Sequence, residues 1–345
     1  MGLDQRALAP SSITKREPRP LLGGPRLSVV IVNYRQWDET AALVRQLAEN
    51  ATLREGGAEI VIVDNHSIPH PVLANLRRMP NVSIRRWKSN HGFAKAVNEG
   101  CRLGQGDWFL LLNPDMSLSN SFLDRVVETL NPLETTEPRV GIVGFHLRNA
   151  DGTQQHSTGP IPSLTATLAR LFLPRPQRKY HVLPAADSAE VPWVTGCCLL
   201  LRRECLEDVG GLDEKFFLYY EDVDLCLRAK QNEWQVRYDP TLAVVHHHPL
   251  HGRHQPAALR LVTRHSLLTF ADKHWPRWQS RLLARLIRVE GRLRRGWSKL
   301  RRDSREAEVF NQLAALAGDF LAADHEEARR RLDRVIRRLD LRIGI

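Results

Sequence analysis

The feature that most constrains the fold is a series of apolar runs, each followed by polar residues and then by a helical pattern. The runs are rich in β-branched and aliphatic residues along their whole length, which is typical of strands buried on both faces of a parallel sheet. We predict strands at 27–34, 58–65, 82–87 and 107–115, and helices at 38–50, 92–103 and 119–130. This alternation of strand and helix favours a doubly wound α/β fold.

Polar residues end three of these predicted strands. In doubly wound sheets, ligands bind beyond the carboxyl ends of the strands, so these residues fall where a ligand would be held. They are Asn33, Asp64 with Asn65, and Asn113 with Asp115.

The pattern changes after about residue 140. The segment up to about residue 275 holds further strands, turns and helices, but without the regular alternation of the first half. We predict a strand and turn over 140–154, a loop over 160–190, a strand leading into a short helix over 191–205, a helix from about Glu221, and two short strands within 233–248 separated by Asp239-Pro240.

Length and composition fit an ordinary globular chain. Its 345 residues, 42% of them hydrophobic, suffice for one large domain or two smaller ones. No apolar stretch approaches the roughly 18 residues that a membrane-spanning helix needs. Residues 1–25 lack the apolar core of a secretory signal and are expected to form a mobile polar tail. The five cysteines form no CxxC pair, so we expect buried thiols in a reducing compartment.

The net charge of +11 is concentrated near the C-terminus. Residues 277–305 contain eleven Lys or Arg, and only Glu290 and Asp303 as acids, so the rest of the chain is nearly balanced. Basic proteins often bind nucleic acid, but charge confined to one segment says little about the central domain. We therefore expect no nucleic-acid partner.

Two stripes run along a helix predicted from residue 277 onward, and both step by three or four residues. The basic stripe is Arg281, Arg285, Arg288, Arg292, Arg295, Lys299 and Arg302, and the apolar stripe is Leu282, Leu286, Val289, Leu293, Trp297 and Leu300. A last helix is predicted at about 305–341. Two interpretations stay open: a helical hairpin packed on the domain with a solvated basic face, or docking of residues 277–345 on an anionic membrane.

Two segments of the first half have residues suited to a nucleotide. The carboxylate of Asp64 could accept a hydrogen bond from the imide of a pyrimidine, although turn and N-cap residues share this pattern. In NHGFAKAVNEG (90–100), small residues at a helix start would let the backbone approach a phosphate. A tight turn packed on the sheet is the plainer interpretation of that segment.

Other residues suit metal binding or general-base catalysis. Asp115 closes the strongest predicted strand and is a hard oxygen ligand suited to Mg²⁺ or Mn²⁺, although an Asx turn is the alternative. One of the histidines at 246–248 could be a second ligand. Glu221, Asp222 and Asp224 form an acidic cluster that suits a general base, or else an acidic helix N-terminus.

Taken in order, the motifs resemble family 2 glycosyltransferases, in particular the bacterial branch with rhamnosyltransferases of cell-wall and O-antigen assembly. The motifs are VVIVNY, VDNHS, NHGFAKAVNEG, LLLNPD, WVTGCCLLLRR, GGLDEKFFLYYEDVDLCLR and VVHHH, and they span about residues 27–270. The resemblance implies a GT-A fold, in which a Rossmann-like nucleotide-binding half merges with a mixed-sheet acceptor half. It also implies inverting transfer from a nucleoside-diphosphate sugar.

The resemblance also implies roles for single residues. Asp222 is the expected general base, and Asp115 with His246 the expected ligands of Mg²⁺ or Mn²⁺. The expected substrate-binding residues are Asn33, Tyr34, Asp64, Asn65, Gly92, Phe93, Ala94, Asn98, Asn113, Gly196, Glu221 and Asp224. Two departures from the family pattern stand out: Asn113 replaces the first of two aspartates in the metal motif, and the HHHPLHG run leaves His247 as an alternative to His246.

The resulting hypothesis is an inverting glycosyltransferase with three segments: a tail at 1–25, a catalytic domain at 26–275 and a basic helical extension at 276–345. By resemblance, dTDP-L-rhamnose is the favoured donor and a lipid-linked or polysaccharide chain the acceptor. We expect a cytoplasmic enzyme that is peripheral on the inner face of the plasma membrane.

Two rival hypotheses make different predictions. A nucleotidyltransferase would need a glycine-rich loop with Lys or Arg after the first strand, where this chain reads NYRQWDET. A non-enzymatic nucleic-acid-binding or scaffold protein built on the basic helices would tolerate loss of the acidic residues, and its affinity would fall steeply with salt.

Overall fold

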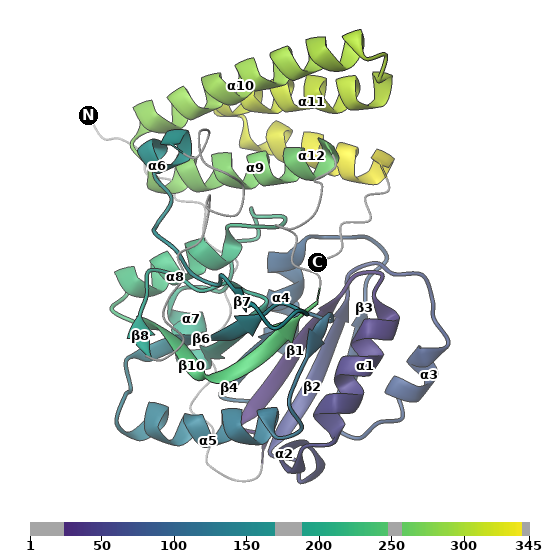
Figure 1. Ribbon diagram of the computed structural model, residues 1–345, viewed down its shortest axis with the longest axis vertical. Helices are drawn as coiled ribbons and strands as arrows, with labels where there is room; N and C mark the ends of the chain where they lie inside the picture. Colours follow the sequence, from purple (N-terminus) through teal and green to yellow (C-terminus); the bar gives the residue numbers. More distant parts are fainter. Residues whose placement is uncertain (1–23, 170–187, 248–256, 340–345) are drawn as a thin grey trace, which may run out of the picture.

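The structure is a computed structural model that describes residues 24–169, 188–247 and 257–339. Nearly all of the tail predicted at 1–25, and most of the loop predicted at 160–190, lie outside these residues. Figure 1 shows a twisted sheet with helices against it, and a layer of C-terminal helices beyond one end of the sheet.

The first half of the sheet is parallel, as the alternation predicts. Strand order here is β3-β2-β1-β4, and the register pairs Asn33 with Asp64 at the carboxyl ends of β1 and β2. Both faces of β1, β2 and β4 are covered, which explains their continuous apolar sequence. The elements are β1 (Leu27–Asn33), α1 (Trp37–Ala48), α2 (Ala51–Arg54), β2 (Ala58–Asp64), α3 (Val72–Leu76), β3 (Val82–Arg86), α4 (Phe93–Leu103) and β4 (Trp108–Leu112).

The second half of the sheet is mixed. Strand β9 pairs antiparallel with both β4 and β6, β10 is parallel to β6, and β5 pairs antiparallel with the end of β10. A nucleotide-type half merged with a mixed half is therefore confirmed. The elements are β5 (Met116–Ser117), α5 (Phe122–Thr135), β6 (Val140–Arg148), β7 (Gln154–Gln155), α6 (Leu164–Ala169), β8 (Ala189–Glu190), β9 (Cys198–Arg202), α7 (Arg203–Asp208), α8 (Glu221–Gln231) and β10 (Gln235–His246).

Two predictions of element boundaries are wrong. The segment 233–248 holds one strand, β10, instead of two, because a register shift between Asp239 and Ala243 takes Pro240 out of the ladder with β6. The helix predicted at 305–341 is two helices, α11 (Ser304–Leu321) and α12 (His325–Leu339). Ala323 adopts a left-handed φ of 58°, which ends α11, and the Asp324 carboxylate accepts from Glu327 N at the start of α12.

The C-terminal layer contains four helices in the described ranges: α9 (Ala257–His274), α10 (Arg277–Leu300), α11 and α12. Helix α9 connects this layer to the FFLYY segment (216–220) before α8, because Ser266 Oγ donates to Leu218 O and the Phe270 ring packs on that of Tyr220. None of the helices for which coordinates are described is long and apolar enough to cross a membrane.

All five cysteines are free and buried, which confirms the expectation of buried thiols. Burial raises the pKa of Cys101 and of Cys205 to about 12. These thiols therefore pack as small apolar groups and do not act as nucleophiles.

Candidate active site

Strained backbone gathers where the polar strand ends meet the acidic cluster. Arg35 and His66 follow β1 and β2 with φ of 61° and 77°, and Gly92 precedes α4 with φ of 94°. Tyr219 and Tyr220, at 73° and 67°, come directly before α8. Left-handed conformations are costly for residues with a side chain and cluster at functional sites. Their positions here outline one edge of the sheet as the candidate site.

At the ends of β1 and β2, the predicted binding residues Asn33 and Asp64 are hydrogen-bonded to each other. Asp64 is 0% exposed; its Oδ1 accepts from Asn33 Nδ2 at 3.0 Å and its Oδ2 from Arg86 Nε at 2.8 Å. The side-chain oxygen Oδ1 of Asn33 accepts a hydrogen bond from Thr40 Oγ1. Both oxygens of Asp64 are thus engaged by protein groups, and its predicted contact with a base stays a prediction. The group that reaches solvent here is the Arg86 guanidinium, which the sequence had not indicated.

Asn65 organises the loop before α4. Its Nδ2 donates to Asn90 Oδ1 at 2.8 Å and to Gly92 O at 3.1 Å, while its Oδ1 accepts from His91 N at 2.8 Å. Tyr34 is likewise buried, with the Arg35 guanidinium 5.2 Å from its ring centroid. Both residues are buried, so they would support the wall of the predicted donor site without being exposed in it.

Gly92 allows two distant segments to touch. A Cβ at this position would lie 2.6 Å from Phe217 O, and φ is positive as well, so only glycine fits. The next amide, Phe93 N, donates to the same carbonyl at 2.7 Å. The start of α4 is thereby held against the FFLYY segment that leads into the acidic cluster.

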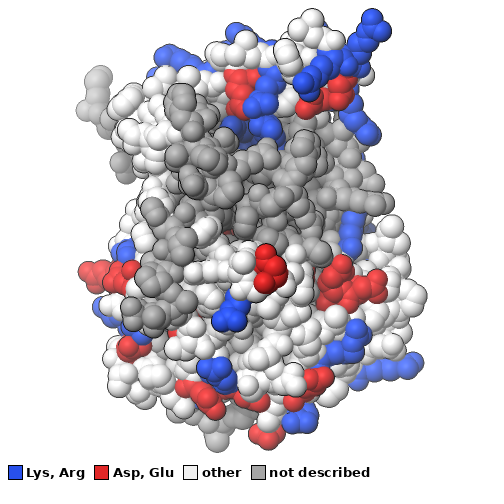
Figure 2. All heavy atoms as spheres, in the orientation of Figure 1, with Lys and Arg blue, Asp and Glu red and all other residues white. Residues whose placement is uncertain are grey.

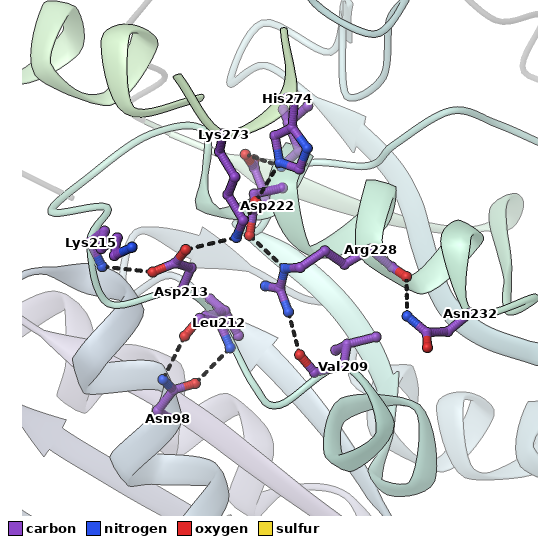
Figure 3. Close-up of polar contacts among 12 residues, drawn as sticks. Asn98, Val209, Leu212, Asp213, Lys215, Asp222, Arg228, Asn232, Lys273 and His274 are labelled. Atoms are coloured by element: carbon purple, nitrogen blue, oxygen red, sulfur yellow. Dashed lines mark hydrogen bonds and ion pairs between the residues drawn. The ribbon is translucent and has the colours of Figure 1, made fainter. Parts of the chain in front are cut away.

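Two other predicted binding residues on α4 face the protein interior. Ala94 is fully buried. Asn98 donates to Leu212 O at 2.8 Å and accepts from Leu212 N at 2.9 Å (Figure 3). Its amide fastens α4 to the loop before FFLYY, and the predicted contact of Asn98 with a ligand stays a prediction.

Asp115 and His246 come together at the end of β4. Antiparallel pairing of β5 with β10 sets His246 opposite Met116, the residue after Asp115. His246 Nε2 lies 3.4 Å from Asp115 Oδ1, and both side chains are buried. Asp115 Oδ1 accepts no hydrogen bond from any described residue.

The two neighbouring histidines have different surroundings. His246 Nδ1 faces the side-chain amide of Gln155 on β7, at 2.9 Å from Gln155 Nε2 and 3.2 Å from Gln155 Oε1. The other ring nitrogen, His246 Nε2, is therefore directed at Asp115. His247 is exposed, and its Nε2 contacts Ser117 Oγ at 2.6 Å. The geometry thus favours His246 as the partner of Asp115. Gln155 was not identified from the sequence, since nothing local connects it to residue 246.

Asp222 lies in the first turn of α8, where the N-terminal end of the helix dipole favours negative charge. Its Oδ2 accepts from Gly196 N at 3.1 Å and its Oδ1 from Val223 N at 2.8 Å. Glu221, beside it, is also buried. The strained residues Tyr219 and Tyr220 set the angle at which α8 begins.

Residues 196 and 197 contact both Asp222 and the segment that leads to Asp115. Gly196 N bonds Asp222, and the next residue, Cys197, accepts from Asn113 N at 2.9 Å. Burial, with a further contribution from the negative charges of Asp115 and Asp222, raises the pKa of the Cys197 thiol to about 12. Asp115 and Asp222 are therefore both close enough to residues 196–197 to act on Cys197, and the space beside these two residues is the candidate site. A Cβ on Gly196 would lie 3.6 Å from both Asp222 and Phe93, so the α4 start borders this space too.

Asp224 does not belong to this space. It is 0% exposed and accepts from Arg228 Nε at 2.8 Å, Lys273 Nζ at 2.8 Å and His274 Nε2 at 2.7 Å. In Figure 3, these three cationic or ionisable side chains converge from α8 and α9. In this structure its oxygens join α8 to α9, and the predicted contact of Asp224 with substrate stays a prediction.

This network makes Asp224→Ala a stability variant. Burial raises the pKa of Asp224, but the His274 hydrogen bond and the charges of Arg228 and Lys273 outweigh it and lower that pKa from 3.8 to about 2. Removing this carboxylate leaves its positively charged partners without their counter-charge. Such a loss typically lowers the free energy of unfolding by about 3–5 kcal/mol. We expect this loss in the free energy of unfolding, measured by urea titration at pH 7.

The pH dependence of that loss follows from the lowered pKa. The stabilisation by Asp224 is complete above its unfolded pKa of 3.8 and disappears as pH falls towards 2, so the difference between variant and wild type should shrink over that window. The matched control is Glu190→Ala, which breaks the exposed pair with Lys230 and should cost less than about 1 kcal/mol. Equal losses in both variants would contradict the structural role of Asp224.

The C-terminal helices also reach the site's supporting loops. Arg329 on α12 donates to Glu214 O at 3.1 Å and His91 O at 3.4 Å, and its guanidinium lies 5.6 Å from the Phe217 ring centroid. Sequence analysis missed Arg329 because the contact spans more than a hundred residues. The helical extension thus braces both the α4 loop and the FFLYY segment.

Comparison with known proteins gives a consistent picture. Residues 25–279 match the family described as "Glycosyltransferase like family 2". The chain is 30% identical over 276 residues to the N-acetylglucosaminyl-diphospho-decaprenol L-rhamnosyltransferase of Mycobacterium tuberculosis H37Rv, covering 74% of this chain and 87% of that protein. It is 23% identical to the rhamnosyltransferase WbbL of Escherichia coli K12, covering 64% and 82%.

Among solved structures, S. aureus TarS 1–349 superposes with a TM-score of 0.51 at 13% identity, covering 92% of each chain. GalNAc-T7, solved with UDP, GalNAc and Mn²⁺, gives a TM-score of 0.54 at 16% identity, covering 76% of this chain and 50% of that one. At these identities the similarity concerns the fold.

Proposed function

Since this chain belongs to glycosyltransferase family 2, we propose that it transfers L-rhamnose from dTDP-L-rhamnose to a hydroxyl of a lipid-linked or polysaccharide acceptor, with inversion at the anomeric carbon. Family membership makes the chain a glycosyltransferase and sets aside the nucleotidyltransferase and nucleic-acid-binding hypotheses. The observation that carries the proposal is that Asp115 and Asp222 both lie close to residues 196–197, Asp222 through a hydrogen bond from Gly196 N and Asp115 through its charge acting on Cys197.

Asp222 is the proposed general base. Its carboxylate is held by two backbone amides, which fix its orientation without neutralising its charge. The acceptor hydroxyl ionises only far above neutral pH, so its proton must pass to a base while the oxygen attacks the anomeric carbon. One base and one displacement leave the product with the anomeric configuration opposite to that of the donor.

Asp115 and His246 are the proposed protein ligands of Mg²⁺ or Mn²⁺. Two ligands at about 2.1 Å from one ion lie roughly 3 Å apart, close to the 3.4 Å between Oδ1 and Nε2. The buried Oδ1 that accepts no hydrogen bond from described residues fits this role, as does the amide of Gln155 behind the ring. Such an ion, when bound, offsets the negative charge that develops on the diphosphate leaving group.

Two protein ligands are few for a divalent ion. No cluster of three or more His, Cys, Asp or Glu side chains suited to a metal is found in the described part of the chain, and residue 113, two before Asp115, is an asparagine. We therefore propose that the metal binds together with the donor diphosphate, whose oxygens complete its coordination. Mn²⁺ in the GalNAc-T7 structure supports a divalent ion.

The donor site is proposed between the ends of β1 and β2 and the start of α4. Arg86 offers a guanidinium at its rim, and Asn65, Gly92 and Phe93 define its wall. Asp64 would act here by holding Arg86. The acceptor side lies towards Glu221 and the FFLYY segment. Because the M. tuberculosis relative is named for a decaprenol-linked substrate, we propose that the enzyme works at the inner face of the plasma membrane.

Donor binding tests the proposed site. We expect dTDP-L-rhamnose to bind in calorimetry with Mg²⁺ or Mn²⁺ present and to bind at least tenfold more weakly in excess EDTA. UDP-glucose and GDP-mannose serve as competitor donors. Tight binding of a different nucleoside-diphosphate sugar would overturn the donor assignment, and equal binding with and without metal would overturn the metal role.

A further inference from the structure

Helix α10 presents large apolar side chains to solvent. Seven large hydrophobic residues are exposed in the described ranges, and six of them, 41 to 80% exposed, lie on this helix. They are Trp278, Leu286, Val289, Leu293, Trp297 and Leu300. At 1.5 Å per residue, the 24-residue helix displays them over about 36 Å. A contiguous apolar surface of this size on one helix indicates an interaction site.

The exposed stripe is not the face that packs. The buried side of α10 consists mainly of small residues, among them Ser280, Ala284 and Gly291. At Gly291, a Cβ would lie 2.8 Å from Ala314 N, so α10 and α11 cross in close contact. The helical hairpin is therefore packed without the large apolar residues, which stay exposed beside the solvated basic face.

A row of cations without acidic partners borders this stripe. The side chains of seven exposed residues make no ion pair or hydrogen bond with other described residues: Arg277, Arg281, Arg285, Arg288, Arg292, Arg295 and Lys299. The one carboxylate of α10, Glu290, is already paired with Arg260, Arg264 and Arg294. On α12, by contrast, arginines such as Arg330 and Arg334 pair with Glu327.

The position of α10 leaves both stripes open to a flat partner. In Figure 1, α10 is the outermost helix of the C-terminal layer and lies away from the sheet. Lys and Arg side chains project along the same upper edge in Figure 2. A second copy of the chain would bring further cations to this face and no free carboxylate of α10, whereas anionic lipid offers both complementary charge and an apolar interior.

We propose that α10 lies in the plane of an anionic membrane, with its apolar stripe inserted at the level of the head groups and its cations on lipid phosphates. This rests on the proposed function only in that a lipid-linked acceptor would be found at the same surface. Arg329 and the α9 contacts join the helical layer to the site's loops, so docking through α10 would hold the catalytic half at the membrane.

Vesicle co-sedimentation of the full chain tests the proposal without any substrate. We expect binding to vesicles of phosphatidylglycerol and phosphatidylcholine, and little binding to phosphatidylcholine alone. Leu293→Glu/Trp297→Glu should abolish binding. Arg288→Gln/Arg292→Gln should weaken it on the order of twentyfold, since each surface cation contributes about fivefold.

Matched controls separate these effects from loss of fold or general charge. Arg330→Gln/Arg334→Gln removes the same net charge from paired residues of α12 and should change binding less than about threefold. Ile68→Glu removes the exposed hydrophobic residue outside α10 and should have no effect. Circular dichroism confirms that each variant is folded.

Three outcomes would overturn the proposal: no binding of the wild type to anionic vesicles, equal binding of the α10 variants, or a dimer that Leu293→Glu/Trp297→Glu disrupts in sedimentation velocity. Failure of the proposed function would look different. In that case vesicle binding persists, while transfer to a short-chain, water-soluble acceptor is absent in wild type and α10 variants alike.

Discussion

Asp222→Asn is expected to lower kcat by about 10²–10⁴-fold while leaving the dissociation constant of the donor nearly unchanged. The asparagine keeps an oxygen that can accept from Gly196 N, so the start of α8 should stay in place. What is lost is the basic carboxylate that takes the acceptor proton. Steady-state kinetics with saturating donor, together with calorimetric donor binding, separates these two quantities.

The control for this variant is Asp151→Asn, which makes the same chemical change in an exposed turn. Its kcat should stay within about twofold of wild type, in line with surface substitutions elsewhere. If Asp222→Asn retained wild-type kcat, the general base would have to be another group, with the adjacent buried carboxylate of Glu221 as the first alternative. If donor binding fell together with kcat, Asp222 would be part of the donor site instead.

Asp115→Ala is expected to abolish metal-dependent donor binding and to lower kcat/KM on the order of 10²–10³-fold. The reason is the small ligand set: with Asn113 in the preceding turn, Asp115 supplies the one carboxylate that the structure places beside His246. Titration of Mn²⁺ by electron paramagnetic resonance, in the presence of donor, measures the metal affinity directly. Raising the metal concentration should not restore wild-type turnover.

Gln155→Ala provides a graded comparison for Asp115→Ala. Its amide contacts His246 Nδ1 but lies on the far side of the ring from Asp115. Loss of such a partner typically weakens metal affinity by 10- to 100-fold, so excess Mn²⁺ should restore turnover in this variant. Unchanged Mn²⁺ affinity in both variants would show that the metal is held elsewhere or is not required.

Much of the fold could be predicted because burial leaves a clear pattern in the sequence. Strands β1, β2 and β4 are covered on both faces and therefore read as continuous apolar runs. The two wrong boundaries, in β10 and between α11 and α12, each depend on a single residue. Pro240 suggested a break between two strands, but a register shift accommodates it within the single strand β10. Ala323 ends α11 in a left-handed conformation, although it is neither glycine nor proline and so gives no sequence signal for a helix end.

The candidate site was predicted less evenly. Residue type and position singled out Asp115, His246 and Asp222, which come from strand ends and a helix start, and the structure brings Asp115 and His246 together. Chemistry alone could not separate Asp222 from Asp224, since both are acids in one helical turn. Their neighbours differ because α8 presents Asp222 to Gly196 and Asp224 to Arg228, Lys273 and His274.

Several supporting residues left no local trace in the sequence. Arg86 is paired with Asp64, Gln155 with His246, and Arg329 with the His91 carbonyl, across separations of 22, 91 and 238 residues. Such contacts exist only once the sheet and the helical layer have formed. The exposed stripe of α10 is a related case, because its spacing matches that of a packing face although a different face packs.

The most direct test of the central claim is the stereochemistry of sugar transfer. Wild-type protein would be incubated with dTDP-L-rhamnose, Mg²⁺ and a short-chain prenyl-diphosphate N-acetylglucosamine, and the disaccharide product analysed by nuclear magnetic resonance. We predict one added rhamnose, in the anomeric configuration opposite to that of the donor, and no such product with Asp222→Asn on the same timescale. A product with retained configuration, or equal transfer by Asp222→Asn, would contradict a single displacement assisted by Asp222.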